Sequence, residues 1–199
     1  MTLPARFAAS HVVRAPTAQA LDTVELYLDY CCPFSRRLFL AWHEHVFPRA
    51  TAEPRFQIVF NHVIQPWHPG SQYMHEAALA VARLAPASFL PFSRELFLHQ
   101  DRWFDTQTAD KSRHAVYREL ADFAHDAVGV QADAVYDLLV VRGNDGNAVV
   151  RDLKRYVRYH RQNGVHVTPS VAVNGVLASA IESSTPADAV WGHLESLAQ

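Results

Sequence analysis

Hydrophobic and polar positions near the start of the chain predict a strand, a helix and a second strand. Residues 24–29 alternate and are rich in strand-forming residues, and residues 34–47 carry apolar side chains at helical spacing. Residues 55–63 alternate again, with apolar side chains at positions 56, 58 and 60, after a turn that contains proline. The pattern therefore predicts a β-α-β unit, whose crossover should be right-handed.

The middle of the chain is predicted to be helical. Regular structure stops at the run Gln65-Pro-Trp-His-Pro-Gly70, and Ser71 then suits the N-cap of a helix that continues to Ala85. Three further apolar stripes at helical spacing predict three more helices. These stripes are Val116, Leu120, Phe123 and Ala127; Val135, Leu138 and Leu139; and Val149, Val150, Leu153, Tyr156 and Val157.

The last part of the chain is predicted to return to strands and then to end in a helix. Residues 169–178 predict two short strands joined by Asn174-Gly175, the strongest local signal for a hairpin with a type I′ turn. Thr185 then suits a helix cap, with Pro186 in the first turn. The predicted order is β-α-β, a block of helices, and β-β-α.

Composition limits the classes of function. With 199 residues and 49% hydrophobic content, the chain can bury the core of one domain. A formal net charge of -2 gives no general attraction to nucleic acid or to an anionic membrane, so we expect neither as a partner. No stretch approaches the roughly 20 apolar residues that span a bilayer. The oligomeric state is not predictable from these features.

The cysteines and the N-terminal segment bear on location. The two cysteines are adjacent, so they cannot join distant parts of the chain, and a reducing compartment fits best. The first 23 residues contain Arg6 and Arg14 and no acid before Asp22, but prolines interrupt them and they lack the apolar core of a secretion signal. We expect a cytoplasmic protein, with a mitochondrial presequence as the weaker alternative.

Cys32 stands where the first predicted strand runs directly into a helix, in the run Asp29-Tyr-Cys-Cys-Pro-Phe-Ser35. A sulfur at a helix start faces unpaired backbone N–H groups and the positive end of the helix dipole, which favour thiolate over thiol. Pro33 suits the first helical position, because its missing N–H would be unpaired there anyway. Arg36 follows four residues later on the same helix face and could add a positive charge. The pattern favours a reactive Cys32 over a merely buried one.

Ser35 occupies the position at which a dithiol site would carry its second cysteine, so no disulfide can form between positions 32 and 35. Two interpretations of Ser35 remain open: a helix-surface residue, or a hydroxyl that donates to the Cys32 thiolate. Successive strand side chains point to opposite faces, and a disulfide between neighbours is strained. We therefore expect a passive Cys31 rather than a resolving thiol, and a site with one reacting thiol.

Two motifs, together with this order of elements, resemble the DsbA-like branch of the thioredoxin superfamily. The run Cys32-Pro-Phe-Ser35 resembles that branch's Cys-Pro-x-Cys motif with the second cysteine changed, and Thr168-Pro169 resembles its cis-proline loop. The resemblance implies an α/β protein with a thioredoxin fold (β-α-β … β-β-α) and a helical insertion of the DsbA type. It implies one domain over residues 1–199, with residues 24–63 and 165–199 as the core and residues 64–164 as the insertion.

Longer runs resemble uncharacterised eukaryotic, fungal-type thioredoxin-like proteins. More distantly, the chain is similar to kappa-class glutathione transferases and related isomerases, which have serine at the place of Cys32. The chain thus departs from the oxidases at Ser35 and from the transferases at Cys32. The runs are Glu25-Leu-Tyr-Leu-Asp-Tyr30, Gln65-Pro-Trp-His-Pro-Gly70 and Gly164-Val-His-Val-Thr-Pro-Ser170.

The resemblance implies a thiol-disulfide oxidoreductase that works with one thiol. A dithiol oxidase uses its second thiol to release product from the mixed disulfide, so this chain would need an outside thiol. Glutathione is the expected co-substrate, no cofactor is expected to be bound permanently, and the partner would be glutathione or a thiol or disulfide peptide. Backbone groups of Thr168 and Ser170, beside Pro169, would hold an extended ligand.

Phe34 and Trp67 are further candidates for binding substrate or glutathione. Trp67 follows the second strand near the end where the active site should lie. It can line a ligand groove or anchor a proline-braced loop, and the loop role is the stronger expectation.

Two alternative functions stay open. One is a transferase or isomerase of the kappa-class manner, in which bound glutathione attacks an electrophile. The other is a binding or chaperone module that kept the fold and lost the dithiol. Cys32→Ser separates the first from the leading prediction, because disulfide exchange needs the sulfur whereas a transferase could keep activity through the hydroxyl.

For the remaining polar residues we expect ordinary structural roles rather than further sites. The chain has twelve histidines, but their spacings fit no metal motif, so we expect scattered surface or capped histidines and no metal site. Candidates considered were His43, His45, His62, His68 and His75. An iron–sulfur cluster shared by two Cys32 thiolates and glutathione stays as an alternative.

Five cations in the last predicted helix of the middle block indicate a solvated helix face rather than a site for an acidic partner. These are Arg151, Lys154, Arg155, Arg158 and Arg161.

Overall fold

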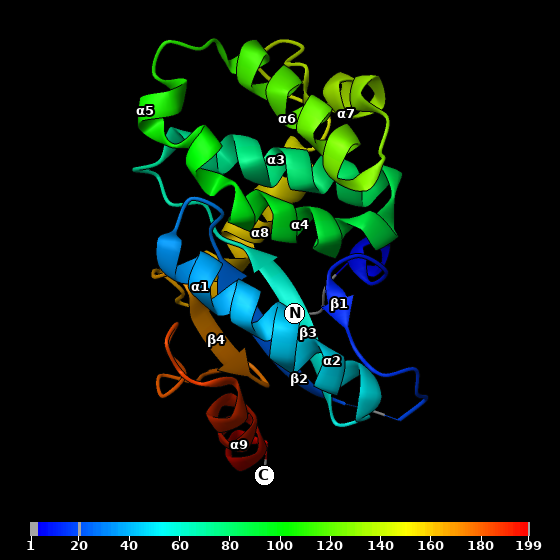
Figure 1. The fold of residues 1–199 in the computed structure, drawn as a ribbon, viewed down its shortest axis with the longest axis vertical. Helices are drawn as coiled ribbons and strands as arrows, with labels where there is room; N and C mark the ends of the chain where they lie inside the picture. Colours follow the sequence, from blue (N-terminus) through cyan, green and yellow to red (C-terminus); the bar gives the residue numbers. More distant parts are fainter. Residues whose placement is uncertain (1–3, 20, 199) are drawn as a thin grey trace.

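A computed structural model describes residues 4–19 and 21–198 and shows a five-stranded mixed sheet with helices around it (Figure 1). The spatial order of the strands is β1-β3-β2-β4-β5. β2 and β3 are parallel, and the other three neighbouring pairs are antiparallel. The strands are β1 (Val12–Val13), β2 (Asp22–Leu28), β3 (Phe56–His62), β4 (Ser170–Val173) and β5 (Val176–Leu177).

The parallel pairing of β2 and β3 confirms the predicted β-α-β unit, with the register Val24 to Ile58 and Leu26 to Phe60. The predicted hairpin is also present, because β4 and β5 pair antiparallel around Asn174-Gly175. Asn174 has φ 51° and Gly175 has φ 83°, the two positive values that a type I′ turn requires.

Most of the remaining chain is helical. Figure 1 shows α3 to α7 gathered at one end of the molecule and α9 at the other, with α1 lying along the sheet. The longer helices are α1 (Pro33–Ala41), α3 (Pro69–Leu84), α4 (Phe89–Leu98), α6 (Arg113–Val128), α7 (Ala132–Leu139), α8 (Val150–Gln162) and α9 (Ala187–Leu197). The short ones are η1 (Ala5–Phe7), η2 (Trp42–Val46), α2 (Phe47–Ala52), η3 (Pro86–Ser88), η4 (Gln100–Trp103) and α5 (Asp105–Thr108).

One face of the sheet enters the main core and the other does not. Alternation along β2 and β3 turns a set of large apolar side chains toward the helices, where they are at most 2% exposed. The opposite face contributes only to a small cluster around Tyr27 and Val63. The core-facing set is Val24, Leu26, Leu28, Phe56, Ile58 and Phe60.

Three local expectations need correction. The helix predicted over residues 34–47 is α1 followed by a π-helical segment, η2, and then α2. Ser71 is not an N-cap, because α3 begins two residues earlier at Pro69 and the Ser71 hydroxyl donates to Asp29 instead. The final helix begins after Pro186, and Thr185 Oγ1 accepts from the backbone N–H of Glu182 rather than capping the helix.

Candidate functional site

Cys32 is the N-cap residue of α1, with extended backbone angles of φ -81° and ψ 120°. Pro33 is the first helical residue, where a proline costs no hydrogen bond. The Cys32 sulfur accepts the backbone N–H of Ser35 at 3.4 Å, as an N-cap side chain should. The side chain is neither buried nor fully exposed. A reacting sulfur at this position is therefore reachable from solvent and faces the N-terminal N–H groups of the helix.

The loop before β4 meets Cys32 from the far end of the chain. The Thr168–Pro169 peptide bond is cis, and the Thr168 carbonyl oxygen lies 3.3 Å from Cys32 Sγ. The next residue, Ser170, opens β4 and pairs with Tyr27 of β2. A Cys32 thiol can donate to this carbonyl, while a thiolate keeps the Ser35 N–H as its donor. Both protonation states of the sulfur thus have a hydrogen-bond partner.

Ser35 is buried, which excludes the interpretation as a helix-surface residue. Its hydroxyl oxygen accepts the backbone N–H of Asp29 at 3.3 Å, so the side chain joins α1 to the end of β2. Its backbone N–H is the group that reaches Cys32. Arg36 is exposed, and within the described ranges its guanidinium makes no hydrogen bond or ion pair. The two residues therefore act on Cys32 differently: Ser35 by direct contact, and Arg36 only as a charge one helical turn away.

An exposed apolar rim lies in the segments that surround Cys32. Phe34 is 54% exposed in the first turn of α1, and Trp67 is 62% exposed in the loop between β3 and α3. Val167, which the sequence did not single out, is 70% exposed just before Thr168. The exposure of Trp67 argues against a buried loop anchor. Large apolar side chains held in water near a reactive group can bury area against a ligand.

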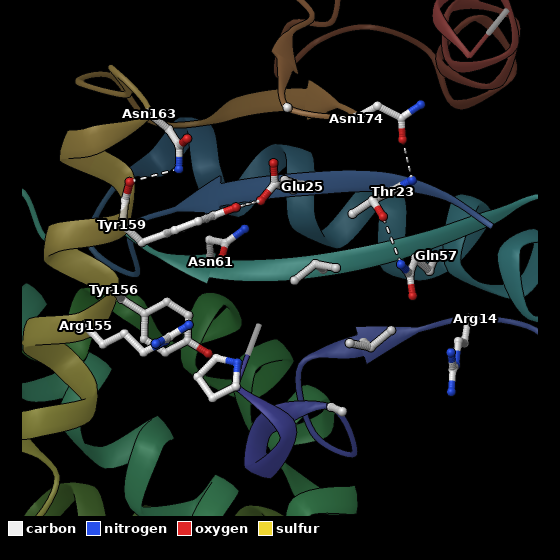
Figure 2. A pocket seen from close by; sticks show the side chains of 15 residues that line it. Arg14, Thr23, Glu25, Gln57, Asn61, Arg155, Tyr156, Tyr159, Asn163 and Asn174 are labelled. Atoms are coloured by element: carbon white, nitrogen blue, oxygen red, sulfur yellow. Dashed lines mark hydrogen bonds between the residues drawn. The ribbon is translucent and has the colours of Figure 1, made fainter. Parts of the chain in front are cut away.

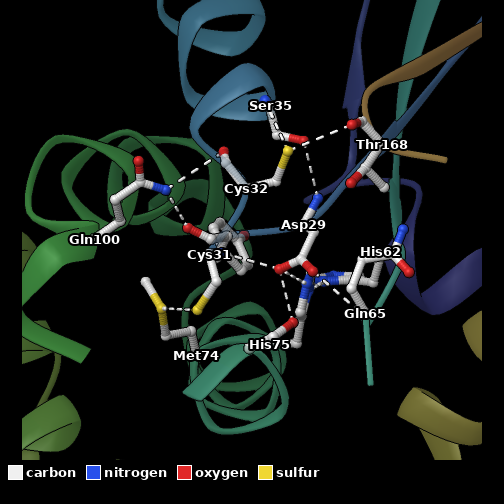
Figure 3. A network of polar contacts seen from close by, with 12 residues as sticks. Asp29, Cys31, Cys32, Ser35, His62, Gln65, Met74, His75, Gln100 and Thr168 are labelled. Carbon is white, nitrogen blue, oxygen red and sulfur yellow. Dashed lines mark hydrogen bonds and ion pairs between the residues drawn. The ribbon is translucent and has the colours of Figure 1, made fainter. Parts of the chain in front are cut away.

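Cys31 has the opposite environment. It is 2% exposed, its thiol lies 3.8 Å from the thioether sulfur of Met74, and Figure 3 shows its sulfur on the other side of the loop from that of Cys32. Burial, followed by the nearby Asp29 carboxylate, raises the pKa of the Cys31 thiol. A Cβ atom on Gly70 would lie 3.6 Å from this sulfur and only 2.1 Å from the Trp103 carbonyl oxygen, so the chain is tightly packed here.

Asp29 holds the loop that carries both cysteines. Its Oδ1 accepts the backbone N–H of Cys31 at 2.9 Å and the Ser71 hydroxyl at 2.7 Å, and its Oδ2 accepts the backbone N–H of Gln65 at 3.0 Å. Burial opposes ionisation, but His75 and the hydrogen bonds outweigh it and lower the pKa of the Asp29 carboxyl. His75 Nε2 lies 3.8 Å from Oδ1, at ion-pair distance. One carboxylate thus ties β2, the loop after β3, and α3 together (Figure 3).

A chain of buried histidines continues from Asp29 into the core. His75 Nδ1 and His62 Nδ1 are 2.6 Å apart, and His62 Nε2 lies 2.9 Å from His11 Nε2. His11 Nδ1 lies 2.7 Å from the Ser10 hydroxyl oxygen. All three rings are fully buried, which corrects the expectation that His62 and His75 are surface or capped residues. Burial lowers the pKa of His11 and of His62.

The hydrogen bonds of this chain must run in one direction, because a neutral imidazole has one N–H. The Ser10 hydroxyl donates to a backbone carbonyl, so it accepts from His11 Nδ1. His62 then donates through Nε2 to His11, and His75 donates through Nδ1 to His62. This order leaves His75 Nε2 facing the Asp29 carboxylate. Among the described residues, no three His, Cys, Asp or Glu side chains are arranged to hold a metal ion.

The sequence carried a signal for part of this network. His62 continues the two-residue period of Phe56, Ile58 and Phe60, so its side chain had to turn toward the core. Asp29 is a polar residue at the end of an otherwise apolar strand, immediately before the cysteines. Nothing in the sequence indicates that His11, far away along the chain, meets them.

A cavity of about 580 Å³ lies on the polar face of β2 and β3, away from Cys32 (Figure 2). Its walls include Glu25, Asn61 and Tyr159, and the Tyr159 hydroxyl donates to the Glu25 carboxylate. None of the predicted site residues lines it. The structure brings together Cys32, Pro33, Ser35, Thr168 and Pro169, while Arg36, Phe34 and Trp67 are exposed.

No protein-family model matches the chain, and no curated protein matches it in sequence. Solved structures do match it. A proposed protein-disulfide isomerase from Pseudomonas syringae is 17% identical with a TM-score of 0.74, over 94% of this chain and 99% of that one. BdbD from Bacillus subtilis is 18% identical with a TM-score of 0.65, over 96% and 94%. MdbA, a thiol-disulfide oxidoreductase from Corynebacterium diphtheriae, is 13% identical with a TM-score of 0.64, over 86% and 84%.

These likenesses cover nearly the whole chain and show its fold. The chain has a thioredoxin fold with a helical insertion of the DsbA type, as the motifs around Cys32 and Thr168 implied. In the described part of the chain, no helix is long and apolar enough to cross a membrane.

Proposed function

We propose that this protein is a thiol-disulfide oxidoreductase in which Cys32 is the only reacting thiol. The observation that carries the proposal is the setting of the Cys32 sulfur, which is reachable at the N-terminus of α1 and lies 3.3 Å from the Thr168 carbonyl. The neighbouring Cys31 is buried against Met74. Of the two thiols in the sequence, only Cys32 is placed to meet a substrate.

The reaction takes place in three exchanges. The Cys32 thiolate attacks one sulfur of a substrate disulfide, an S–S bond forms to Cys32, and the other substrate sulfur leaves as a thiolate that takes up a proton. Ser35 cannot resolve this mixed disulfide, because a hydroxyl is not a thiol nucleophile and its oxygen is turned to Asp29. A glutathione thiolate instead attacks the substrate sulfur of the mixed disulfide, which frees the Cys32 thiolate and leaves a disulfide between substrate and glutathione. A second glutathione thiolate attacks the glutathionyl sulfur of that disulfide, and the remaining substrate sulfur leaves as a thiolate that takes up a proton. The substrate disulfide is reduced to two thiols while two glutathiones become one glutathione disulfide.

The exposed rim supports an extended polypeptide as the other partner. Phe34, Trp67 and Val167 can bury apolar area against substrate side chains. Ser170 begins a strand next to the cis-proline loop, and backbone groups of that loop can pair with an extended segment. Exchange that depends on glutathione requires a reducing compartment, and we accordingly place the protein in the cytoplasm as part of the proposal.

Mass spectrometry of trapped mixed disulfides tests the proposal. Cys31→Ser protein, incubated with glutathione disulfide, should form one glutathione adduct at Cys32, and added glutathione should remove it. Cys32→Ser protein, which keeps Cys31, should form no adduct in the folded state. Absence of an adduct on Cys31→Ser protein would instead favour a binding module.

Turnover of a glutathionylated peptide gives the second readout. Cys32→Ser should abolish it, and activity that survives in this variant would point to a transferase. Ser35→Cys restores the second thiol at the position of the family motif. We expect this variant to release a trapped peptide without glutathione and to form a disulfide between positions 32 and 35.

A further inference from the structure

Helix α8 concentrates positive charge in a protein whose net charge is slightly negative. The one acid of α8, Asp152, is buried and bound by Arg6 and Arg83, which come from other parts of the chain. It therefore does not neutralise the cations of its own helix. These cations are Arg151, Lys154, Arg155, Arg158 and Arg161.

Three of these cations border an open groove of about 600 Å³ between α8 and the start of α3. Lys154, Arg158 and Arg161 are exposed, and within the described ranges their side chains make no hydrogen bond or ion pair. The groove floor is apolar, with Ile64, Val150, Leu153 and Val157 among its residues. A basic rim over an apolar floor distinguishes this groove from a merely solvated helix face.

The helix dipole does not account for all of this charge. Cations stabilise a helix within its last turn, which fits Arg161. Lys154 lies in the second turn of α8, where the dipole has little effect. The helix dipole therefore does not explain the charge at Lys154.

The groove adjoins the loops that hold Cys32. Ile64 is followed by Gln65, and Gln72 of the groove is preceded by Ser71; both of these neighbours bind the Asp29 carboxylate. At its other side, α8 ends at Gln162 and leads within a few residues to Thr168, whose carbonyl contacts the Cys32 sulfur. A chain bound in the groove can thus continue to the reacting thiol.

We infer that this groove binds a polypeptide segment with acidic and apolar side chains that flanks the disulfide of the substrate. The inference rests on the proposed function and names its substrate class. From Val150 to Gln162 α8 rises about 18 Å, at 1.5 Å per residue. An extended peptide covers that length with about five residues, at 3.3 Å each, which is more than glutathione supplies. Carboxylates would pair with the rim cations, and apolar side chains would lie on the floor.

Peptide disulfides that differ only in their flanking charges test the inference. Three peptides of equal length carry aspartate and leucine, serine and leucine, or lysine and leucine beside the same disulfide. At low salt we expect kcat/KM to be at least about tenfold higher for the aspartate peptide than for the lysine peptide, and to converge as salt is raised. Equal rates for the three peptides at low salt would overturn the inference.

A matched pair of substitutions locates the effect. Lys154→Glu and Arg151→Glu change the same charge on the same helix, but only Lys154 borders the groove. Lys154→Glu should lower kcat/KM for the aspartate peptide about threefold, and the triple change with Arg158→Glu and Arg161→Glu should reverse the preference. Arg151→Glu should have less than half of the Lys154→Glu effect. Equal effects would indicate a general field of α8 and would overturn the groove as the binding site.

Two controls separate this inference from the proposed function. The rate at which glutathione disulfide forms the adduct on Cys32 should be unchanged in the triple variant, because this reaction does not use the groove. Binding of the aspartate peptide with serine in place of its cysteines, followed by fluorescence anisotropy, needs no exchange chemistry. If this peptide binds but no disulfide reacts, the proposed function fails while the groove remains a peptide-binding site. If disulfides react without charge preference, the proposed function holds and the groove is not the binding site.

Discussion

Cys31 and Cys32 are neighbours in the sequence but belong to two different regions of the molecule. Cys32 opens onto a rim of exposed apolar side chains, among them Phe34 and Trp67. Cys31 points into an interior where Asp29 leads to a chain of buried histidines (Figure 3). One peptide bond thus separates a thiol that is reachable from solvent from a thiol that is buried.

The difference shows how the loop is kept in position without the Cys32 side chain itself being fixed by packing. The Asp29 carboxylate accepts three hydrogen bonds, from Cys31, Gln65 and Ser71. These bonds fix the backbone around Cys31 from the interior side. Within the described residues, the Cys32 sulfur has only the Ser35 N–H and the Thr168 carbonyl as hydrogen-bond partners. Buried polar networks are costly to disrupt when each member is satisfied. We therefore expect substitutions in the interior to change stability and substitutions on the rim to change reactivity.

Alkylation of the two thiols should show the largest contrast. In the folded protein we expect iodoacetamide to label Cys32 more than about a thousandfold faster than Cys31, because Cys31 is reached only after the structure opens. Burial also raises the pKa of the Cys31 thiol and so reduces its thiolate form. Peptide mapping by mass spectrometry with time gives both rates. Comparable rates in the absence of denaturant would remove the distinction between the two regions.

Loss of the Asp29 carboxylate should be the most damaging single change to the interior. Asp29→Ala leaves the Ser71 hydroxyl and two backbone N–H groups without their acceptor and is expected to cost about 3 kcal/mol or more in unfolding free energy. Asp29→Asn keeps one carbonyl acceptor in nearly the same shape and should cost less. Urea unfolding of both variants measures the difference. Similar stability of the alanine variant and the wild type would contradict the supporting role of Asp29.

The buried histidines should make the interior sensitive to acid. The pKa values of folded His11 and His62 lie below the ordinary value of 6.5, so the unfolded chain binds more protons than the folded one below that pH. The contribution of these two histidines to the free energy of unfolding is thus complete above about pH 6.5. Below that pH it falls by about 1.4 kcal/mol per pH unit for each histidine. The lowered pKa of Asp29 acts with the same sign only below about pH 4.

The slope of unfolding free energy against pH between 6.5 and 5 tests this expectation. His11→Phe should reduce the slope by about one proton, even though it also lowers stability by unpairing Ser10 and His62. A wild-type slope near zero in this range would show that the buried rings do not titrate as proposed.

The fold and the position of Cys32 at the start of α1 were predictable because their signals are local. The alternation of β2 and β3, the Asn174-Gly175 turn and the strand-to-helix position of Cys32 each lie within a few residues. For Ser35 the sequence left two interpretations open, because burial of a small polar side chain depends on which residues pack against it in the folded chain. The bounds of α3 were shifted for a similar reason: the Ser71 hydroxyl has a tertiary partner that outweighs its capping preference.

The histidine chain as a whole could not be predicted, because it joins three segments that are distant in the sequence. His11 precedes β1, His62 ends β3, and His75 lies in α3. The period of β3 indicates that His62 is buried, but His11 and His75 are each as compatible with a surface position as with a buried one. Only the tertiary arrangement brings the rings to hydrogen-bond distance and turns three unremarkable residues into one network.

Truncation of the rim should have the smallest effect on stability and still change function. Phe34→Ala and Trp67→Ala remove side chains that are more than half exposed, so the unfolding free energy should change by less than about 0.5 kcal/mol. Each should lower kcat/KM for a peptide disulfide by about two- to tenfold, because area that would be buried on binding is lost. Neither should change the rate at which glutathione disulfide forms the adduct on Cys32. Leu197→Ala, which truncates a 44% exposed side chain in α9, should alter neither quantity. A loss of stability above about 1 kcal/mol in the rim variants would mean that these side chains support the loop as Asp29 does. The two regions would then share one role, and the division between reactivity outside and stability inside would fail.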